Sequence, residues 1–307
     1  MLRHNEGLVA HKRRVKPQAF LPRPVIRRAI PSHDACSRPD REAAFPRETF
    51  MPSNKTNQTN RYGALAAEIY DIDKPFGALP DTAFHLERFA GFGRPILEPA
   101  CGTGRTLVPF LEAGHDITGF DQSPEMLERC RARCAERGFT PDLGQQRFED
   151  FRYDRRFGAI LVPVGTFTLI DDAATAQGVL RRFRDHLEPG GIVVLDIQPL
   201  SLLANTGDDR RRWTADNGDL LTVEGVRTKT DWLAQRAEYQ IRYERWRDNR
   251  LVETHLEPMA QRYWGLEEFR LVLEASGFGQ VSVVGDYARG RPMRSGVRSL
   301  TFEAART

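Results

Sequence analysis

PILEPACGTGR, residues 95–105, is the stretch of this sequence that decides the fold. A short apolar run ends in the acid Glu98, a turn of small residues follows, and a helical pattern begins after Arg105. This order predicts a strand, a Gly-rich loop and the start of a helix. Because glycine has no Cβ, such a loop lets backbone N–H groups and a helix N-terminus approach a ligand closely. Asp121 ends the next apolar run, where an acid can bind both hydroxyls of a ribose, so the pattern predicts a nucleoside-containing cofactor.

The details of the loop favour one cofactor over another. The dinucleotide fingerprint is G-x-G-x-x-G, and here Leu107 stands where the third glycine belongs. Glu98, just before the turn, would repel a pyrophosphate and attract a cation. S-adenosylmethionine (SAM) carries a sulfonium and an ammonium and has no phosphate, so the loop fits SAM better than NAD. An NAD-dependent oxidoreductase stays a third alternative.

The segment Glu98-Pro99-Ala100-Cys101-Gly102-Thr103-Gly104 resembles the first motif of class I SAM-dependent methyltransferases, and residues 163–168, described below, resemble the corresponding segment of their small-molecule members. The resemblance extends over residues 61–305. It implies that the loop faces the methionine half of SAM and that Glu98 contacts the ammonium group, directly or through water. It also implies that Asp121 pairs with the ribose hydroxyls and that Gln122 helps to position the ribose or the adenine. The loop residues expected to bind the cofactor are Ala100, Cys101, Gly102 and Gly104.

The match weakens at the third predicted strand, which ends near Phe148. Members of the family often carry an acid and then an apolar residue here, and this chain has Arg147-Phe148. Arginine cannot accept a hydrogen bond from the adenine amino group. Either Glu149 or Asp150 does so, or Phe148 contributes packing and its backbone N–H.

The fourth predicted strand leads into an apolar segment with hydroxyl groups, residues 163–168, and Val164 is expected beside the cofactor. Enzymes that methylate nucleobase amines usually carry an Asn/Asp-Pro-Pro-aromatic motif here, which this sequence lacks. Many small-molecule members begin with a Tyr-Asp helix that folds over the cofactor. By that resemblance Tyr70 is the candidate catalytic residue; the alternative is a tyrosine packed on the core.

Strands alternate with amphipathic helices from Arg61 to Gln198. This alternation predicts an α/β fold with a doubly wound, Rossmann-like sheet. With the resemblance, the expectation is a seven-stranded sheet that ends in an antiparallel hairpin. Residues 199–264 read as an antiparallel β insertion, which either roofs the site or forms a homodimer surface. Residues 1–55, basic and rich in proline, are expected to be a disordered tail, and residues 56–307 the methyltransferase domain.

Composition narrows the class of protein. The 307 residues carry a formal net charge of +3, which gives no general case for nucleic-acid binding. No apolar run reaches the roughly 18 residues that span a bilayer, so no membrane partner is expected. The sequence has 4 cysteines, and Cys130 and Cys134 lack further ligands nearby for zinc, so no metal site is expected. A reduced, cytoplasmic protein is the expectation.

The sequence therefore predicts a SAM-dependent methyltransferase that acts on N or O of a small-molecule acceptor. The acceptor pocket is expected between the Tyr70 helix, the Gly165-Thr166 loop and the insertion, and its candidate residues are Tyr263, Trp264, Tyr287 and Arg289. Arginines of the 285–291 loop either bind a carboxylate or phosphate of the acceptor or are solvated surface charge. Two other classes stay open: a nucleic-acid or protein methyltransferase that uses the basic tail, and a SAM-binding module without catalysis.

Overall fold

The computed structural model describes residues 59–77, 79–205, 207 and 209–307. The predicted tail at residues 1–55 lies outside the described residues. None of the described helices combines the length and the apolar character needed to cross a membrane.

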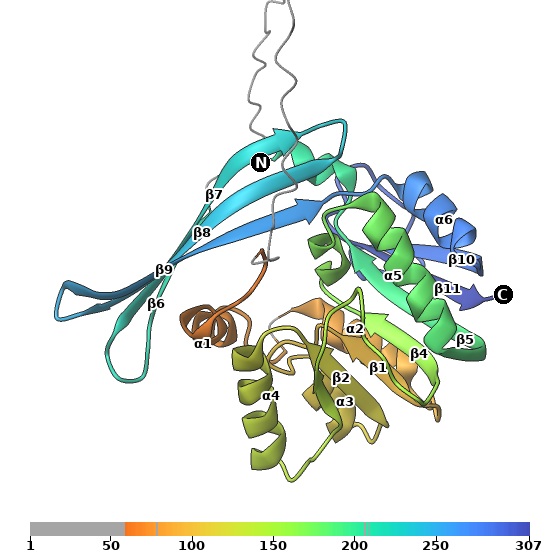
Figure 1. The fold of residues 1–307 in the computed structure, drawn as a ribbon, viewed down its shortest axis with the longest axis horizontal. Coiled ribbons are helices and arrows are strands. Elements are labelled where there is room, and N and C mark those ends of the chain that lie inside the picture. The colour runs from red at the N-terminus through yellow and green to blue at the C-terminus, as the bar shows by residue number, and fades with distance from the viewer. Residues whose placement is uncertain (1–58, 78, 206, 208) are drawn as a thin grey trace, which may run out of the picture. The chain divides into compact units, whose positions relative to one another are not determined.

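A seven-stranded sheet forms the core of the described chain (Figure 1). Its strands are β1 (Ile96–Pro99), β2 (Ile117–Asp121), β3 (Leu143–Gln145), β4 (Phe157–Val162), β5 (Leu187–Ile197), β10 (Phe278–Gly285) and β11 (Leu300–Arg306). The order across the sheet is β10-β11-β5-β4-β1-β2-β3. β11 pairs antiparallel with β5 and with β10, and the other neighbours pair in parallel, which confirms the predicted fold class. The chain changes direction across the sheet between β1 and β4, and open α/β sheets bind their ligands at such a point.

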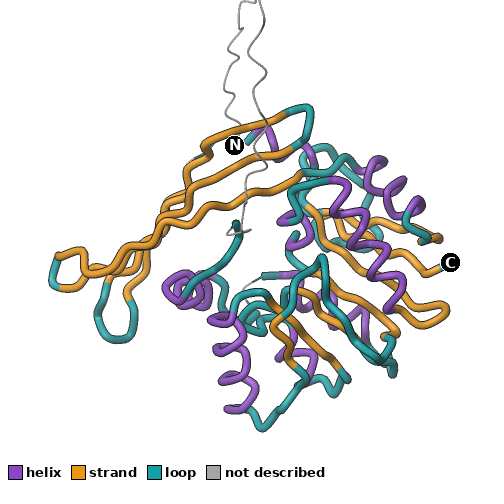
Figure 2. The backbone as a smooth tube through the Cα atoms, in the orientation of Figure 1, coloured by secondary structure: helices purple, strands orange, loops and turns teal. Residues whose placement is uncertain are grey.

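Helices pack on both faces of this sheet (Figure 2). They are α2 (Pro80–Phe89), α3 (Leu107–Glu112), α4 (Pro124–Glu136), α5 (Ala173–His186) and α6 (Leu266–Ala275). One apolar cluster joins Leu107 of α3 and Leu127 of α4 to the sheet. The other joins Phe183 of α5 and Phe269 of α6. Burial on both faces explains why β4 is apolar throughout.

Two helices begin where their sequence signals predict. Ser123 Oγ accepts a hydrogen bond from the Met126 N–H at 3.0 Å, with Pro124 in the first turn of α4. Asp172 likewise accepts from the Thr175 N–H at 2.8 Å and caps α5. The α4 cap matters for the site because it lies directly after β2.

A four-stranded antiparallel sheet follows β5 in the chain. Its strands are β6 (Asp209–Thr214), β7 (Leu220–Asp231), β8 (Arg236–Arg247) and β9 (Arg250–Arg262). The predicted turn between β8 and β9 has φ of 49° at Asp248 and 60° at Asn249, as a tight hairpin requires. Helix α1 (Ala64–Asp73) packs on this sheet, where Leu65 and Ile69 join Tyr243 in one apolar cluster.

Three features of the sheets differ from the prediction. β3 ends at Gln145 rather than near Phe148, because the chain then turns and the Phe151 N–H donates to the Arg147 carbonyl at 3.0 Å. β5 begins at Leu187 and continues through Pro189-Gly190-Gly191, a sequence that favours a break between elements, with an irregularity in its pairing with β4. β6 was not predicted, since its polar sequence DRRRWT lacks the apolar alternation of a strand.

Candidate active site

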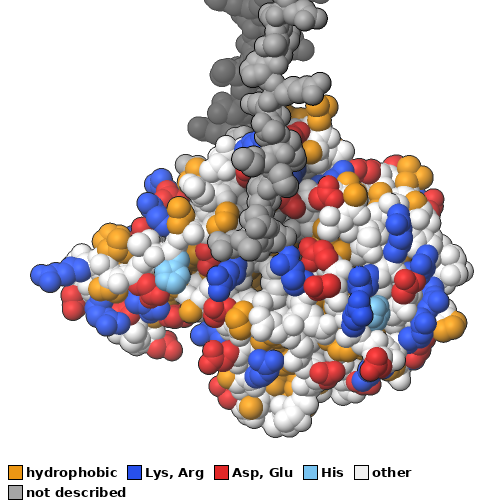
Figure 3. Space-filling view, viewed as in Figure 1, with side chains coloured by type: hydrophobic (Ala, Val, Ile, Leu, Met, Phe, Trp, Pro, Cys, Tyr) orange, Lys and Arg blue, Asp and Glu red, His pale blue; other side chains and the backbone are white. Residues whose placement is uncertain are grey.

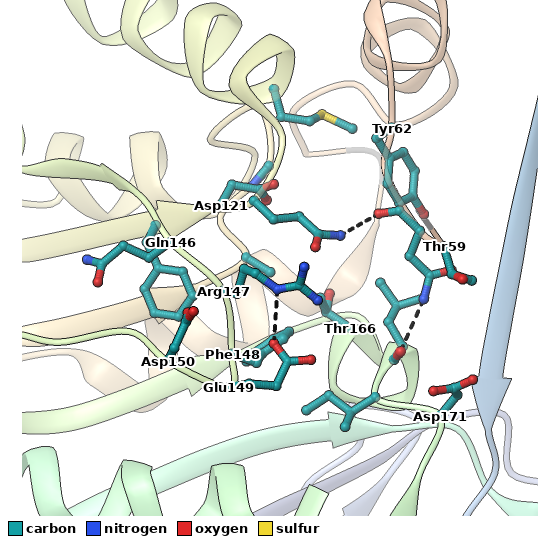
Figure 4. A pocket seen from close by; sticks show the side chains of 18 of the residues that line it. Thr59, Tyr62, Asp121, Gln146, Arg147, Phe148, Glu149, Asp150, Thr166 and Asp171 are labelled. Atoms are coloured by element: carbon teal, nitrogen blue, oxygen red, sulfur yellow. Dashed lines mark hydrogen bonds and ion pairs between the residues drawn. The ribbon is translucent and has the colours of Figure 1, made fainter. Parts of the chain in front are cut away.

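A cavity of about 570 Å³ lies at the carboxyl ends of β1 and β2 and beside the turn after β3. Figure 4 shows Asp121, Phe148, Glu149 and Thr166 around this cavity, with Thr59 and Tyr62 on its facing side. The predicted site residues that line it are Tyr70, Ala100, Gly102, Asp121, Gln122, Phe148 and Glu149. We call it the cofactor cavity.

The Gly-rich loop after β1 contains two glycines with different roles. Gly102 has φ of 57°, and a Cβ built there would meet no atom within 4 Å, so its open side faces the cavity that it lines. Gly104 has φ of 84°, and a Cβ there would lie 2.8 Å from Cys130 Sγ. Gly102 therefore keeps space open for a ligand, whereas Gly104 allows the loop to pack on α4.

Asp121 joins this loop to the end of β2. Its Oδ2 accepts from the Gly102 N–H at 2.9 Å and its Oδ1 from the Ser123 N–H at 2.8 Å. Burial raises the pKa of Asp121 to about 6, although these backbone hydrogen bonds act in the opposite direction. The carboxylate is thus held rigidly at the cavity wall, with lone pairs left for hydroxyl groups of a ligand.

Glu98 is a buried acid without a cation of its own. Its side chain is 2% exposed, and its Oε2 has no hydrogen-bond partner among the described residues. The nearest guanidinium, that of Arg105, donates instead to Asp81 Oδ2 at 2.6 Å. Burial raises the pKa of Glu98 well above its usual range, and the charge of Arg105 only partly opposes this. A cationic group of a ligand would give Oε2 a hydrogen-bond donor and would stabilise the negative charge of the buried carboxylate.

The structure places other predicted residues differently. Cys101 packs in the core beneath the loop rather than in the cavity, where its Sγ would lie 2.9 Å from a Cβ at Gly119. Gly104 does not line the cavity either, because it faces Cys130 of α4. The Gln122 Nε2 donates to the Asn60 carbonyl at 2.6 Å, which commits the side-chain amide to the neighbouring segment. Val164 lines a second cavity and not the first.

The turn after β3 supplies one wall of the cofactor cavity. Arg147, Phe148, Glu149 and Asp150 all line it, and the Arg147 Nε lies 3.4 Å from Glu149 Oε2. The ring of Phe148 packs edge-on against Phe120 with 6.1 Å between centroids. An apolar ring and acidic groups therefore lie together where an adenine is expected.

The segment before α1 closes the cavity, and the sequence did not reveal it. Asn60 has φ of 60° and donates from Nδ2 to the carbonyls of Leu169 and Ala260, each at 3.1 Å. The backbone N–H groups of Tyr62 and Gly63 donate to Glu257 at 3.1 and 2.9 Å. We call residues 59–63 the strap. The only local signal was an asparagine, which tolerates positive φ better than most residues.

A second cavity, of about 820 Å³, lies between α1, the turn at residues 164–166 and the inner face of the antiparallel sheet. We call it the acceptor cavity, because an acceptor pocket was predicted at this place. Tyr62, Tyr70, Thr166 and Leu169 line both cavities and form their junction. Burial raises the pKa of Tyr70, so its hydroxyl stays protonated at neutral pH.

The four residues predicted for the acceptor pocket do not lie together in one cavity. Trp264 is wrong as a pocket residue, since it is fully buried and packs on Phe269. Tyr263 and Tyr287 line an adjoining hollow of about 520 Å³. The Arg289 guanidinium lies over the ring of Phe84, 4.8 Å from its centroid.

Residues 96–191 match the methyltransferase domain family. The chain is 32% identical over 138 residues to dTDP-3-amino-3,4,6-trideoxy-alpha-D-glucopyranose N,N-dimethyltransferase of Streptomyces venezuelae, covering 42% of this chain and 56% of that protein. It is 28% identical over 209 residues to the cypemycin N-terminal methyltransferase of a Streptomyces species, covering 68% and 81%. The chain thus spans little more than half the length of the first of these relatives.

A solved structure shares the fold. It is an S-adenosylmethionine-dependent methyltransferase from Clostridium acetobutylicum ATCC 824, with a TM-score of 0.65 at 20% identity, covering 78% of this chain and 97% of that chain. These matches confirm the resemblance drawn from the Gly-rich loop.

Proposed function

We propose that this chain, whose residues 96–191 match the methyltransferase domain family, is a class I SAM-dependent methyltransferase that transfers a methyl group from SAM to a nitrogen of a small-molecule acceptor. The observation that carries the proposal is the junction of the two cavities at Tyr62, Tyr70, Thr166 and Leu169. A cofactor on one side and an acceptor on the other would meet there, shielded by the strap and α1.

The residues around the cofactor cavity suit SAM. Glu98, with its unpaired Oε2, would hold the ammonium group, and the open side of Gly102 would admit the methionine half. Asp121 would accept the ribose hydroxyls, and the turn after β3 would surround the adenine, with Phe148 against its ring. Asp121 lines the cofactor cavity, whereas the buried Glu98 does not line it but lies close enough to Asp121 for their charges to interact. Two acids placed in this way would suit a cation and would oppose the pyrophosphate of NAD.

When bound, SAM supplies a carbon already activated by its sulfonium, so the protein's part is mainly alignment and exclusion of water. None of the four junction side chains carries a carboxylate or an imidazole. An alcohol acceptor would require removal of its proton by a base, whereas a neutral amine attacks with its own lone pair. The junction therefore favours nitrogen over oxygen as the acceptor atom.

Tyr70 would position the acceptor rather than act as a base. Its raised pKa keeps the proton on the hydroxyl, whose oxygen can accept a hydrogen bond from the amine. The relatives support a nitrogen acceptor, since one is named for an N,N-dimethyl transfer and the other for N-terminal methylation.

The alternative classes have less support. Basic and acidic side chains are interspersed on the face shown in Figure 3, unlike the concentrated basic stripe of nucleic-acid-binding proteins. The inner face of the antiparallel sheet lines the acceptor cavity, which favours its role as a roof.

Among the described residues, Cys101, Cys130 and Cys134 are free thiols, consistent with the reducing cytoplasm that we propose.

Incubation of the protein with methyl-labelled SAM and pooled small amines, followed by mass spectrometry, tests the proposal. We expect labelled methyl groups on an amine, with Asp121→Ala as the inactive control. Bound SAM that is never consumed with any pool would favour the non-catalytic module. Label on RNA or protein instead, with binding that weakens steeply with salt, would favour the macromolecular alternative.

A further inference from the structure

Two arginines lie at the end of the acceptor cavity away from the junction. Arg227 of β7 and Arg298, in the loop before β11, line both the acceptor cavity and the adjoining hollow of about 520 Å³. Neither lines the cofactor cavity, and the hollow includes none of the four junction residues. An acceptor that fills the cavity would reach from the junction at one end to these arginines at the other.

Arg227 is a guanidinium with no counter-anion among the described residues. It donates from Nη1 to the Leu203 carbonyl at 2.6 Å and from Nη2 to the Tyr239 hydroxyl at 2.9 Å. Its Nε–H is buried and has no partner among the described residues. No carboxylate of the described residues lies within 4.0 Å, so this part of the chain provides no counter-ion for the charge. A cation held in this way is costly unless an anion completes the site.

The two tyrosines beside Arg227 form a chain of hydrogen bonds with its guanidinium. The Tyr239 hydroxyl lies 2.6 Å from the Tyr263 hydroxyl, which donates to Gln261 Oε1 at 3.2 Å. Because the Tyr263 hydroxyl donates its hydrogen bond to Gln261, the Tyr239 hydroxyl donates to the Tyr263 oxygen and accepts a hydrogen bond from the Arg227 guanidinium. Both hydroxyl protons are therefore used, and neither tyrosine can neutralise the guanidinium.

The acids that line the two spaces are already paired. In the acceptor cavity Arg211 binds both Asp73 and Asp209, and Lys74 adds a second contact to Asp73 at 2.7 Å. In the hollow, Asp81 binds Arg105. Among the described residues that line the two spaces, the positive charge that remains belongs to Arg227 and Arg298.

The loop that carries Arg298 adds further positive charge. Arg289, Arg291, Arg294 and Arg298 are all exposed, and none forms an ion pair within the described part of the chain. Arg298 lines the two spaces, and the arginines of its loop outnumber the loop's acid, Asp286, so the net positive charge favours the approach of an anionic ligand.

We propose that Arg227 and Arg298 bind an oxyanion of the acceptor, a phosphate or a carboxylate, and so hold its amine at the junction beside Tyr70. This inference rests on the proposed function and names its substrate class, an amine that also carries an anionic group. Guanidinium groups match both oxyanions through paired N–H donors. Of the predicted loop arginines, Arg289 is directed toward Phe84, and Arg298 takes the role instead.

Titration of the full chain with inorganic pyrophosphate, phosphate and succinate, followed by NMR, tests the site directly. We expect Arg227→Gln to weaken binding of the preferred anion about tenfold or more, since it loses charged hydrogen bonds. Arg298→Gln, at an exposed position, should weaken it about threefold. Arg212→Gln is the matched control, because Arg212 is an exposed arginine of β6 that lines neither the acceptor cavity nor the hollow. The Arg212→Gln protein should bind the anion as tightly as the parent does.

The outcomes are distinct. Tighter binding of the phosphates or of succinate identifies the source of the oxyanion, and either result supports the site. No measurable anion binding, equal binding in all variants, or an equal loss in Arg212→Gln would overturn it. SAM binding, measured in the same variants, should not change. A parent that binds the anion but not SAM would refute the proposed function and leave the anion site standing.

Discussion

Asp121 accepts a hydrogen bond on Oδ2 from the backbone N–H of Gly102 at 2.9 Å. This contact joins the carboxyl end of β2 to the turn after β1, which are neighbouring strands of the sheet. It holds the Gly-rich loop open with an acid at its edge, so the loop and the proposed ribose site form one unit.

The two loop glycines should respond differently to substitution. Gly102→Val should abolish SAM binding while the protein stays folded, because the side chain would enter the cofactor cavity. Gly104→Ala should instead lower the free energy of unfolding by about 2–4 kcal/mol, from positive-φ strain and from collision with Cys130 Sγ and Val108. Calorimetric titration and denaturant unfolding of both variants separate these effects. Equal losses of stability in the two variants would contradict the distinction.

Glu98 should release a proton when SAM binds. Burial raises the pKa of Glu98 well above its usual range, so the carboxyl of the free protein holds its proton to higher pH than an exposed glutamate, and a neighbouring ammonium group would lower that pKa. At pH 7, titration in buffers of different ionisation enthalpy should show proton release by the parent and less release by Glu98→Gln. Asp121, with a pKa of about 6, is mostly ionised at that pH and contributes little.

The same variant should bind SAM about tenfold to a hundredfold more weakly, as expected for loss of a charged hydrogen bond. Equal proton release and equal affinity in the two proteins would remove Glu98 from the cofactor site.

Most of the fold could be predicted because its signals are local. Ser123-Pro124 starts α4, and the apolar run at residues 157–162 forms β4. The acids Glu98 and Asp121 could be paired because neighbouring parallel strands bring their carboxyl ends together. The strap could not be predicted, since Asn60 binds residues 109 and 200 positions away.

The proposed anion site could not be predicted from the sequence either, because it also depends on contacts between residues that are far apart in the chain. Arg227 is one of many arginines in the sequence. What distinguishes it is that it lines the acceptor cavity, has no described carboxylate partner and carries a buried Nε–H without a described hydrogen-bond partner. That property depends on packing between the sheet and the loop before β11, which no local pattern encodes.

Tyr70→Phe should reduce turnover at least about tenfold and leave the affinity for SAM nearly unchanged. Tyr70 lies at the junction of the cavities, where its hydroxyl would orient the acceptor, and the remaining ring keeps the packing of α1. Steady-state kinetics with the identified amine, together with SAM titration, checks both halves. Unchanged turnover would remove Tyr70 from the site.

Asn60→Ala should loosen the strap. The substitution removes the side-chain hydrogen bonds to Leu169 and Ala260 and favours a backbone without positive φ. Backbone amides of residues 60–63 should then exchange faster with deuterium, and SAM should dissociate more rapidly. Asn217→Ala, in the turn between β6 and β7, is a control that should change neither quantity. Slow exchange at the strap in Asn60→Ala would show that other contacts hold it.

Calorimetric titration of SAM into the parent and into Asp121→Ala tests the central claim most directly. We predict one SAM bound per parent chain, and no measurable binding to a folded Asp121→Ala protein. Binding of SAM to Asp121→Ala as tight as to the parent would contradict the assignment of this cavity to the cofactor.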